Sequence, residues 1–243
     1  MKLDLTRVSR ERNVRAVVQV IAHRGAPRLA RENTLASFRA AAGTGAQGIE
    51  LDVRRTADGE LIVHHDPVLE GGRPIVECRR ADLPAHVPSL TEALDACRGK
   101  IVDIEIKNLP GEPDFDPQDR VAGEVVTLLG ERTESLAAWL ISSFRRETID
   151  RCRAADPRIA TGWLTVGVVR DEDIAWAVGA GHGALHPWDP MVDGDVIERC
   201  HAAGLHVNTW TCNDPERARQ LTSWGIDGIC TDVPDVLVDA LGV

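Results

Sequence analysis

Two short apolar segments of this 243-residue chain carry charged residues two positions apart. The first segment contains Glu50 and Asp52, and the second contains Glu105 and Lys107. Side chains at positions i and i+2 of a β-strand point to the same face, so each pair projects to one side. Three carboxylates brought together in a buried place repel one another unless a cation neutralises them. The spacing therefore predicts a metal site and an anionic substrate.

The residue types near these acids suit the hydrolysis of a phosphodiester. Carboxylate oxygens favour one hard divalent cation, Mg²⁺ or Ca²⁺, over zinc. Arg24 can hold phosphate oxygens through two hydrogen bonds, and Lys107 adds a point charge. His23 and His65 can divide the proton transfers, one activating an attacking hydroxyl and the other protonating the leaving alkoxide.

Short apolar runs alternate with amphipathic helical stretches, and no Ser- or Gly-rich linker divides them. This pattern predicts an α/β fold in which residues 1–243 form a single (β/α)₈ TIM barrel, and not an open doubly wound sheet. Barrel active sites lie at the C-terminal ends of the strands, where the charged residues named above fall. The expected strands are residues 17–22, 49–53, 101–106, 139–142, 159–164, 183–186, 206–210 and 228–231.

Residues 60–65 do not fit this alternation, because only Asp58 and Gly59 separate them from the second strand. A parallel crossover needs a dozen or more residues, whereas Asp-Gly is a favoured hairpin turn. A short antiparallel hairpin extension is therefore expected after the second strand. A two-residue loop would place His65 opposite Asp52 across the hairpin.

Helix starts are marked by capping residues. Asn33 or Thr34 can cap the first helix. Ser89 with Glu92 three residues later forms a capping box. Asp214 precedes a first-turn proline, which predicts the start of another helix.

Composition excludes several classes of function. A net charge of −10 argues against binding to nucleic acid, and no apolar stretch approaches the ~20 residues of a membrane span. Six scattered cysteines contain no Cys-x-x-Cys pair, which indicates small buried side chains and a cytoplasmic location. The expected partner is a small-molecule phosphodiester, and the oligomeric state stays open.

Several short motifs follow one another along most of the chain. They are His23-Arg24-Gly25, Glu32-Asn33-Thr34, Glu50-Leu51-Asp52, His65-Asp66, Val87-Pro88-Ser89-Leu90, Ile104-Glu105-Ile106-Lys107, Ser143-Phe144, Trp210-Thr211-Cys212-Asn213 and Gly225-Ile226-Asp227-Gly228-Ile229-Cys230-Thr231-Asp232. In order and spacing, from about Val20 to Pro234, they resemble the glycerophosphodiester phosphodiesterase family of metal-dependent TIM-barrel enzymes.

The resemblance implies roles for nine residues. The metal ligands would be Glu50, Asp52 and Glu105, the acid–base pair His23 and His65, and the phosphate or substrate contacts Arg24, Lys107, Trp210 and Glu32. The resemblance also implies metal-dependent hydrolysis of a glycerophosphodiester to an alcohol and a phosphomonoester such as glycerol 3-phosphate.

Residues 66–88 depart from the family pattern, because members usually carry a longer insertion there. A shortened lid would leave the site open to a lysophospholipid or another diester. Two alternatives remain: a phospholipase-C-like lyase that stops at a cyclic phosphate, and a non-catalytic barrel that binds phosphorylated ligands. The pair His23 and His65 speaks against the second, because binding alone needs no acid–base groups.

Overall fold

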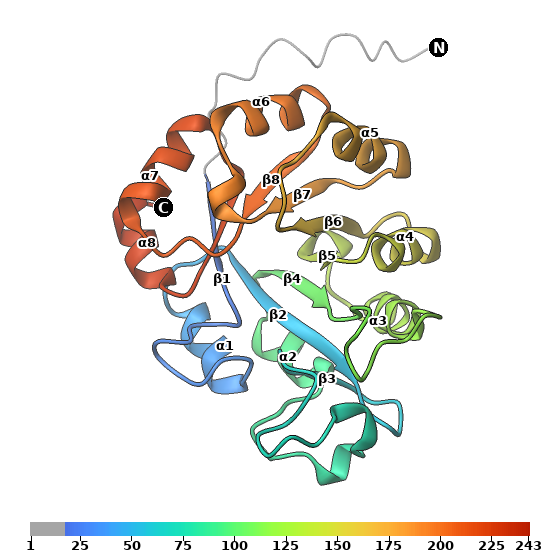
Figure 1. The fold of residues 1–243 in the computed structure, drawn as a ribbon. Coiled ribbons are helices and arrows are strands. Elements are labelled where there is room, and N and C mark those ends of the chain that lie inside the picture. Colours follow the sequence, from blue (N-terminus) through green and yellow to red (C-terminus); the bar gives the residue numbers. More distant parts are fainter. Residues whose placement is uncertain (1–17) are drawn as a thin grey trace, which may run out of the picture.

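Eight parallel strands form a closed barrel in the computed structural model, which describes residues 18–243. β1 pairs with both β2 and β9, so the ring closes and helices surround it (Figure 1). The expected (β/α)₈ barrel is confirmed for this part of the chain. Residues 1–17, which the expected domain and the start of its first strand include, lie outside the described residues. Its strands are β1 (Gln19–Ala22), β2 (Gly48–Arg55), β4 (Ile101–Ile106), β5 (Trp139–Ser143), β6 (Ala160–Thr165), β7 (Ala184–Pro187), β8 (His206–Thr209) and β9 (Gly228–Thr231).

The helices begin largely where capping residues predict them. Thr34, and not Asn33, caps the first helix by accepting a hydrogen bond from the Ser37 amide. The capping box of Ser89 and Glu92 is present. No helix within residues 18–243 has the length and apolar character needed to cross a membrane. The helices are α1 (Leu35–Ala42), α2 (Leu90–Ala96), α3 (Arg120–Gly130), α4 (Arg146–Ala155), α5 (Asp171–Ala180), α6 (Gly194–Ala202), α7 (Pro215–Trp224) and α8 (Pro234–Leu241).

Alternation along β2 and β4 separates the core from the site. Leu51 and Ile104 point outward and are buried in the apolar core with Phe38 of α1. The side chains at the alternate positions of both strands point into the barrel. In the β2–β4 pairing, Asp52 lies opposite Glu105. Neighbouring strands lie only ~4.8 Å apart, so the pairing brings these carboxylates together.

The hairpin extension is confirmed, but its expected register is wrong by one residue. β3 (Leu61–Val63) runs antiparallel to β2 and pairs Val53 with Val63. The His64 amide donates to the Asp52 carbonyl at 3.0 Å, so His64, and not His65, lies opposite Asp52.

The loop length explains this difference. The Thr56 amide donates to the Glu60 carbonyl at 3.0 Å, which leaves three loop residues instead of two. Gly59 has a φ of +88°, in the left-handed region that three-residue hairpin loops require. The Thr56 hydroxyl further holds the loop by contacting Asp58 at 2.7 Å.

Replacing Gly59 by alanine is expected to lower the free energy of unfolding by ~1 kcal/mol, because an L-residue is strained at this φ. Gly167 is a matched control, since it lies in a loop with an ordinary φ and no atom of residues 18–243 lies within 4 Å of its added Cβ. Denaturant unfolding of both variants measures the effect. Equal stability of the two variants would contradict the proposed strain.

Residues 66–88 form a small projection beside the barrel, at the bottom of Figure 1. They contain two short 3₁₀ turns, at Ile75–Glu77 and Arg80–Asp82. An ion pair of 2.6 Å between Arg31 and Glu70 ties the projection to the loop before α1. A separate apolar cluster joins the projection to Ile62 of β3 and includes Ile75, Cys78, Leu83 and Val87.

Candidate active site

Three carboxylates meet inside the barrel, two from β2 and one near the C-terminal end of β4. One oxygen each from Glu50, Asp52 and Glu105 lie within 4.8 Å of one another. The three residues are only 5%, 0% and 7% exposed. The structure thus brings together the three acids that were expected to bind a metal.

Two cations partly neutralise this cluster. Lys107 Nζ lies 2.9 Å from Asp52 Oδ1 and also contacts Glu105. Arg24 Nε lies 3.4 Å from Asp52 Oδ2. Burial alone would raise the pKa of Asp52, but the charges of Lys107 and Arg24 lower it below its ordinary value. Asp52 is therefore ionised at neutral pH.

The negative charge of Glu50 is less well compensated by nearby positive charge than that of Asp52. Burial, followed by the charges of Asp52 and Glu105, raises the pKa of Glu50 well above its ordinary value. Its Oε2 accepts a hydrogen bond of 2.8 Å from the Arg24 amide. Its buried Oε1 has no hydrogen-bond donor among residues 18–243. A buried oxygen without a donor, beside two further carboxylates, fits one hard divalent cation.

His23 follows β1 and is oriented by an acid from the other end of the chain. Its Nδ1 lies 2.6 Å from Asp232 Oδ1. Asn213 donates to the other oxygen of Asp232 at 2.7 Å. The hydrogen bond from His23 lowers the pKa of Asp232 below its ordinary value. Because a carboxylate only accepts, Nδ1 carries a proton, and Nε2 takes no part in this hydrogen bond.

His65 lies just beyond the hairpin and is about one-third exposed (36%). Its Nδ1 contacts Asp66 Oδ1 at 2.7 Å. Burial lowers the pKa of His65; the Asp52 charge opposes this shift, and Lys107 adds to it. His65 thus lies within electrostatic reach of the acid cluster, although hairpin pairing does not place it there.

Glu32 and Asn33 border the cluster from the loop before α1. Arg24 donates to Glu32 Oε1 at 2.9 Å. Asn33 donates to Asp52 Oδ2 at 2.6 Å, a role that the sequence did not reveal. In the sequence, Asn33 stands beside Glu32 in one of the short motifs, and this position was the signal for a role at the site. Its helix-capping propensity suggested only the start of a helix.

Trp210 forms an apolar wall directly after β8. Its indole Nε1 donates to the His186 carbonyl at 2.8 Å. Its ring packs edge-to-face on Phe144, with centroids 5.3 Å apart. Lys107 Nζ lies 5.8 Å from the centroid of the Phe144 ring. The expected substrate contact, Trp210, lines a small cavity together with Glu50 and Glu105.

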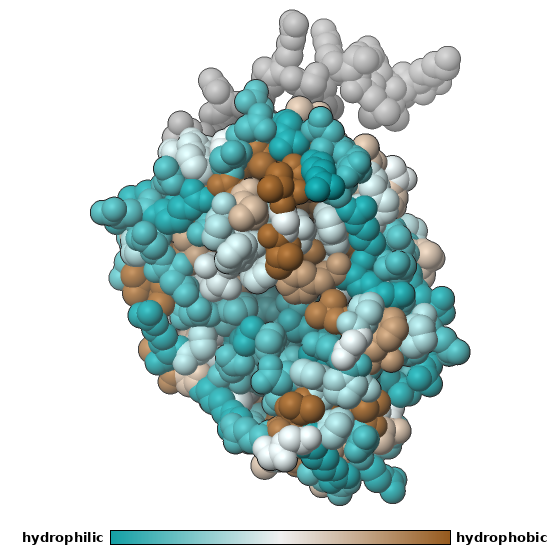
Figure 2. Space-filling model, in the orientation of Figure 1, coloured by the Kyte–Doolittle hydropathy of each residue, from teal (hydrophilic) through white to brown (hydrophobic). Residues whose placement is uncertain are grey.

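A cleft of about 360 Å³ lies between the barrel and the projection. Glu32 and His65 line it from the barrel side, and Leu69 and Glu70 line it from residues 66–88. Figure 2 shows a hydrophilic hollow near the middle of one face of the molecule, with a group of hydrophobic residues above it. The cleft can hold a small polar molecule next to His65.

Known proteins share this sequence pattern and fold. The glycerophosphodiester phosphodiesterase of Caldanaerobacter subterraneus subsp. tengcongensis is 29% identical over 235 residues, covering 90% of this chain and 96% of that protein. A phosphodiesterase of Oleispira antarctica, solved with its product sn-glycerol-3-phosphate, superimposes with a TM-score of 0.85 at 26% identity. This match covers 93% of this chain and 98% of the other.

A glycerophosphodiester phosphodiesterase of Thermotoga maritima gives a TM-score of 0.76 at 26% identity, covering 91% and 97% of the two chains. The sequence pattern of the Glycerophosphoryl diester phosphodiesterase family matches residues 23–236, which include all nine expected site residues. This chain therefore belongs to the glycerophosphoryl diester phosphodiesterase family of phosphoric diester hydrolases.

Proposed function

We propose that this protein hydrolyses a glycerophosphodiester to an alcohol and glycerol 3-phosphate. The observation that carries the proposal is the convergence of Glu50, Asp52 and Glu105 within 4.8 Å, bordered by two cationic side chains. The Oleispira antarctica relative was solved with sn-glycerol-3-phosphate as its product. With a divalent cation on the three carboxylates, Arg24 and Lys107 would make the site positive enough to bind a phosphomonoester.

The three carboxylates would hold one divalent cation, Mg²⁺ or Ca²⁺. When bound, the cation would stabilise negative charge that develops on the phosphoryl oxygens. Arg24 and Lys107 would place further positive charge against the same oxygens, because both side chains already lie at the cluster. Trp210 and Glu32 would border the bound substrate.

His23 and His65 would transfer the protons of the reaction. Asp232 fixes the orientation of the His23 ring, and Asp66 contacts that of His65. The pKa of His65 is lowered, mainly by burial, so this ring is neutral at pH 7. This favours His65 as the acceptor of a proton from the attacking hydroxyl, and His23 as the donor to the leaving alkoxide.

Residues 66–88 would act as a short lid beside the alcohol part of the substrate. Leu69 and Glu70 line the cleft next to His65. An open cleft would admit a glycerol-linked alcohol or the headgroup of a lysophospholipid. Such substrates would place the enzyme in lipid and glycerol metabolism. The six free, buried cysteines support a cytoplasmic location.

A substrate panel tests this function. Glycerophosphocholine, glycerophosphoethanolamine and a lysophosphatidylcholine would each be incubated with Mg²⁺ or Ca²⁺ and followed by phosphorus NMR. We expect a glycerol 3-phosphate signal from at least one glycerophosphodiester. A cyclic phosphate that persists would instead identify a lyase. Binding without turnover, in both metals, would identify a binding barrel.

Asp232→Asn is expected to lower kcat about 10²-fold with little change in KM, because the amide can stabilise the wrong tautomer of His23. Steady-state kinetics on the best substrate of the panel measures the split between the two constants. Asp235→Asn is the matched control, since this exposed acid lies three residues away on α8. An unchanged kcat in Asp232→Asn would remove Asp232 from the mechanism.

A further inference from the structure

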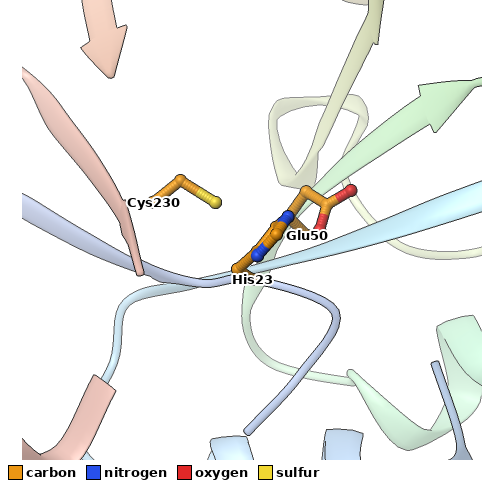
Figure 3. Close-up of side chains that lie close together, drawn as sticks. All are labelled: His23, Glu50 and Cys230. Atoms are coloured by element: carbon orange, nitrogen blue, oxygen red, sulfur yellow. The ribbon is translucent and has the colours of Figure 1, made fainter. Parts of the chain in front are cut away.

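A second group of potential ligands lies next to the three-carboxylate cluster. One ligand atom each from His23, Glu50 and Cys230 lie within 4.8 Å of one another (Figure 3). We propose that these three residues form an inhibitory site for a zinc ion. The site shares Glu50 with the three-carboxylate cluster but replaces its other two acids by a nitrogen and a sulfur ligand.

Strand pairing brings the three ligands together. β1 lies between β2 and β9, and Ile21 of β1 pairs with Cys230. The His23 amide donates to the Thr231 carbonyl at 2.9 Å, which holds His23 at the end of β9. Figure 3 shows the Cys230 sulfur pointing toward His23 and Glu50. The three side chains thus come from neighbouring parts of one ring.

The ligand set matches zinc better than it matches a hard cation. Zinc binds thiolate, imidazole and carboxylate, whereas Mg²⁺ and Ca²⁺ take oxygen ligands. Glu50 Oε1 is buried and has no donor among residues 18–243, so it is an unpartnered acceptor within the group. Cys230 is 7% exposed. A metal there would be largely shielded from water.

The surrounding hydrogen bonds prepare His23 for metal binding. Asp232 holds Nδ1 at 2.6 Å, which leaves Nε2 as the nitrogen for the ion. A carboxylate on the other ring nitrogen is the usual support of zinc-binding histidines. On binding, the Cys230 thiol would release its proton to solvent as the Zn–S bond forms. The thiolate and the Glu50 carboxylate would then balance the two positive charges of the ion.

The expected inhibition rests on the proposed function. A zinc ion at this site would bind His23, which is proposed to transfer a proton, and Glu50, which is proposed to hold the hard cation. Zinc is therefore expected to inhibit the Mg²⁺-loaded enzyme, and more Mg²⁺ should relieve the inhibition through competition for Glu50. Cys230 has no part in the proposed reaction. Replacing it should leave the rate without zinc unchanged.

Zinc titrations of the wild type, Cys230→Ser and Cys200→Ser test the site. We expect the zinc concentration for half inhibition to rise at least ~10-fold in Cys230→Ser, since loss of even an outer partner of a metal ligand weakens binding ~10–100-fold. Cys200→Ser is the matched control, because this buried cysteine lies in α6. Equal zinc sensitivity in all three proteins would overturn the proposal.

Cobalt binding to the same proteins gives a readout that does not depend on activity. Co²⁺ alone, added to the metal-free wild type, should produce a thiolate-to-cobalt charge-transfer absorption that Cys230→Ser lacks. This result would support the site even if the substrate panel failed. Absence of the absorption in the wild type would overturn the proposal. This outcome is read from the wild type alone, so it holds even if Cys230→Ser does not fold.

Discussion

Replacing His65 by alanine is expected to lower kcat by ~10²–10⁴ while KM changes little. The neutral ring of His65 would accept the proton of the attacking hydroxyl, and alanine cannot replace that function. Steady-state kinetics over a range of pH measures the effect. In the wild type, the lowered pKa of His65 should place the acid limb of kcat/KM below pH 6.5, because the base works only when unprotonated.

His64→Ala is the matched control for this prediction. His64 lies opposite Asp52 in the hairpin, and its ring Nδ1 is 2.9 Å from the Asp66 carbonyl. We expect this variant to keep kcat within about threefold, because only its backbone pairs with β2. If His64→Ala lost most of its activity while His65→Ala kept wild-type activity, the proton-transfer role would belong to His64 and not to His65. His23→Ala should lose as much activity as His65→Ala.

Replacing Glu50 by glutamine is expected to lower kcat/KM by ~10³ or more, because cation stabilisation of a transition state contributes several kcal/mol. Glutamine keeps the shape of the side chain but removes the charge at the oxygen that has no donor among residues 18–243. Kinetics and calorimetric titration with Mg²⁺ and Ca²⁺ measure the loss. Excess chelator should reduce the wild type to a similar level.

Asp103→Asn is the control for Glu50→Gln. Asp103 pairs with Glu50 across β2 and β4, but its carboxylate accepts a hydrogen bond of 2.7 Å from Ser142. Removing the charge of Asp103 should change the affinity for Mg²⁺ or Ca²⁺ by less than tenfold, in a variant whose thermal unfolding shows an intact fold. Full activity of the wild type in excess chelator, or unchanged cation affinity in Glu50→Gln, would refute the assignment of the metal site.

Local sequence was sufficient for most of the fold. The two-residue period of β2 and β4 determines which side chains share a face. The direction in which Glu50, Asp52 and Glu105 point therefore follows from the sequence itself. The capping box at Ser89 likewise involves residues three apart. The antiparallel direction of β3 followed from the short connection at Gly59. Each of these signals acts between residues that are close in sequence.

The tertiary structure decided the features that depend on long-range contacts or exact loop geometry. Closure of the ring joins His23 to Asp232, which lies 209 positions later, and no local pattern encodes that contact. The same closure brings Cys230 to the site. The hairpin register depended on one extra loop residue, a difference that the Asp-Gly pattern does not resolve. Sequence period therefore determined which way the acids point, and barrel closure determined which side chains meet them, because pairing of the first and last strands exists only in the folded ring.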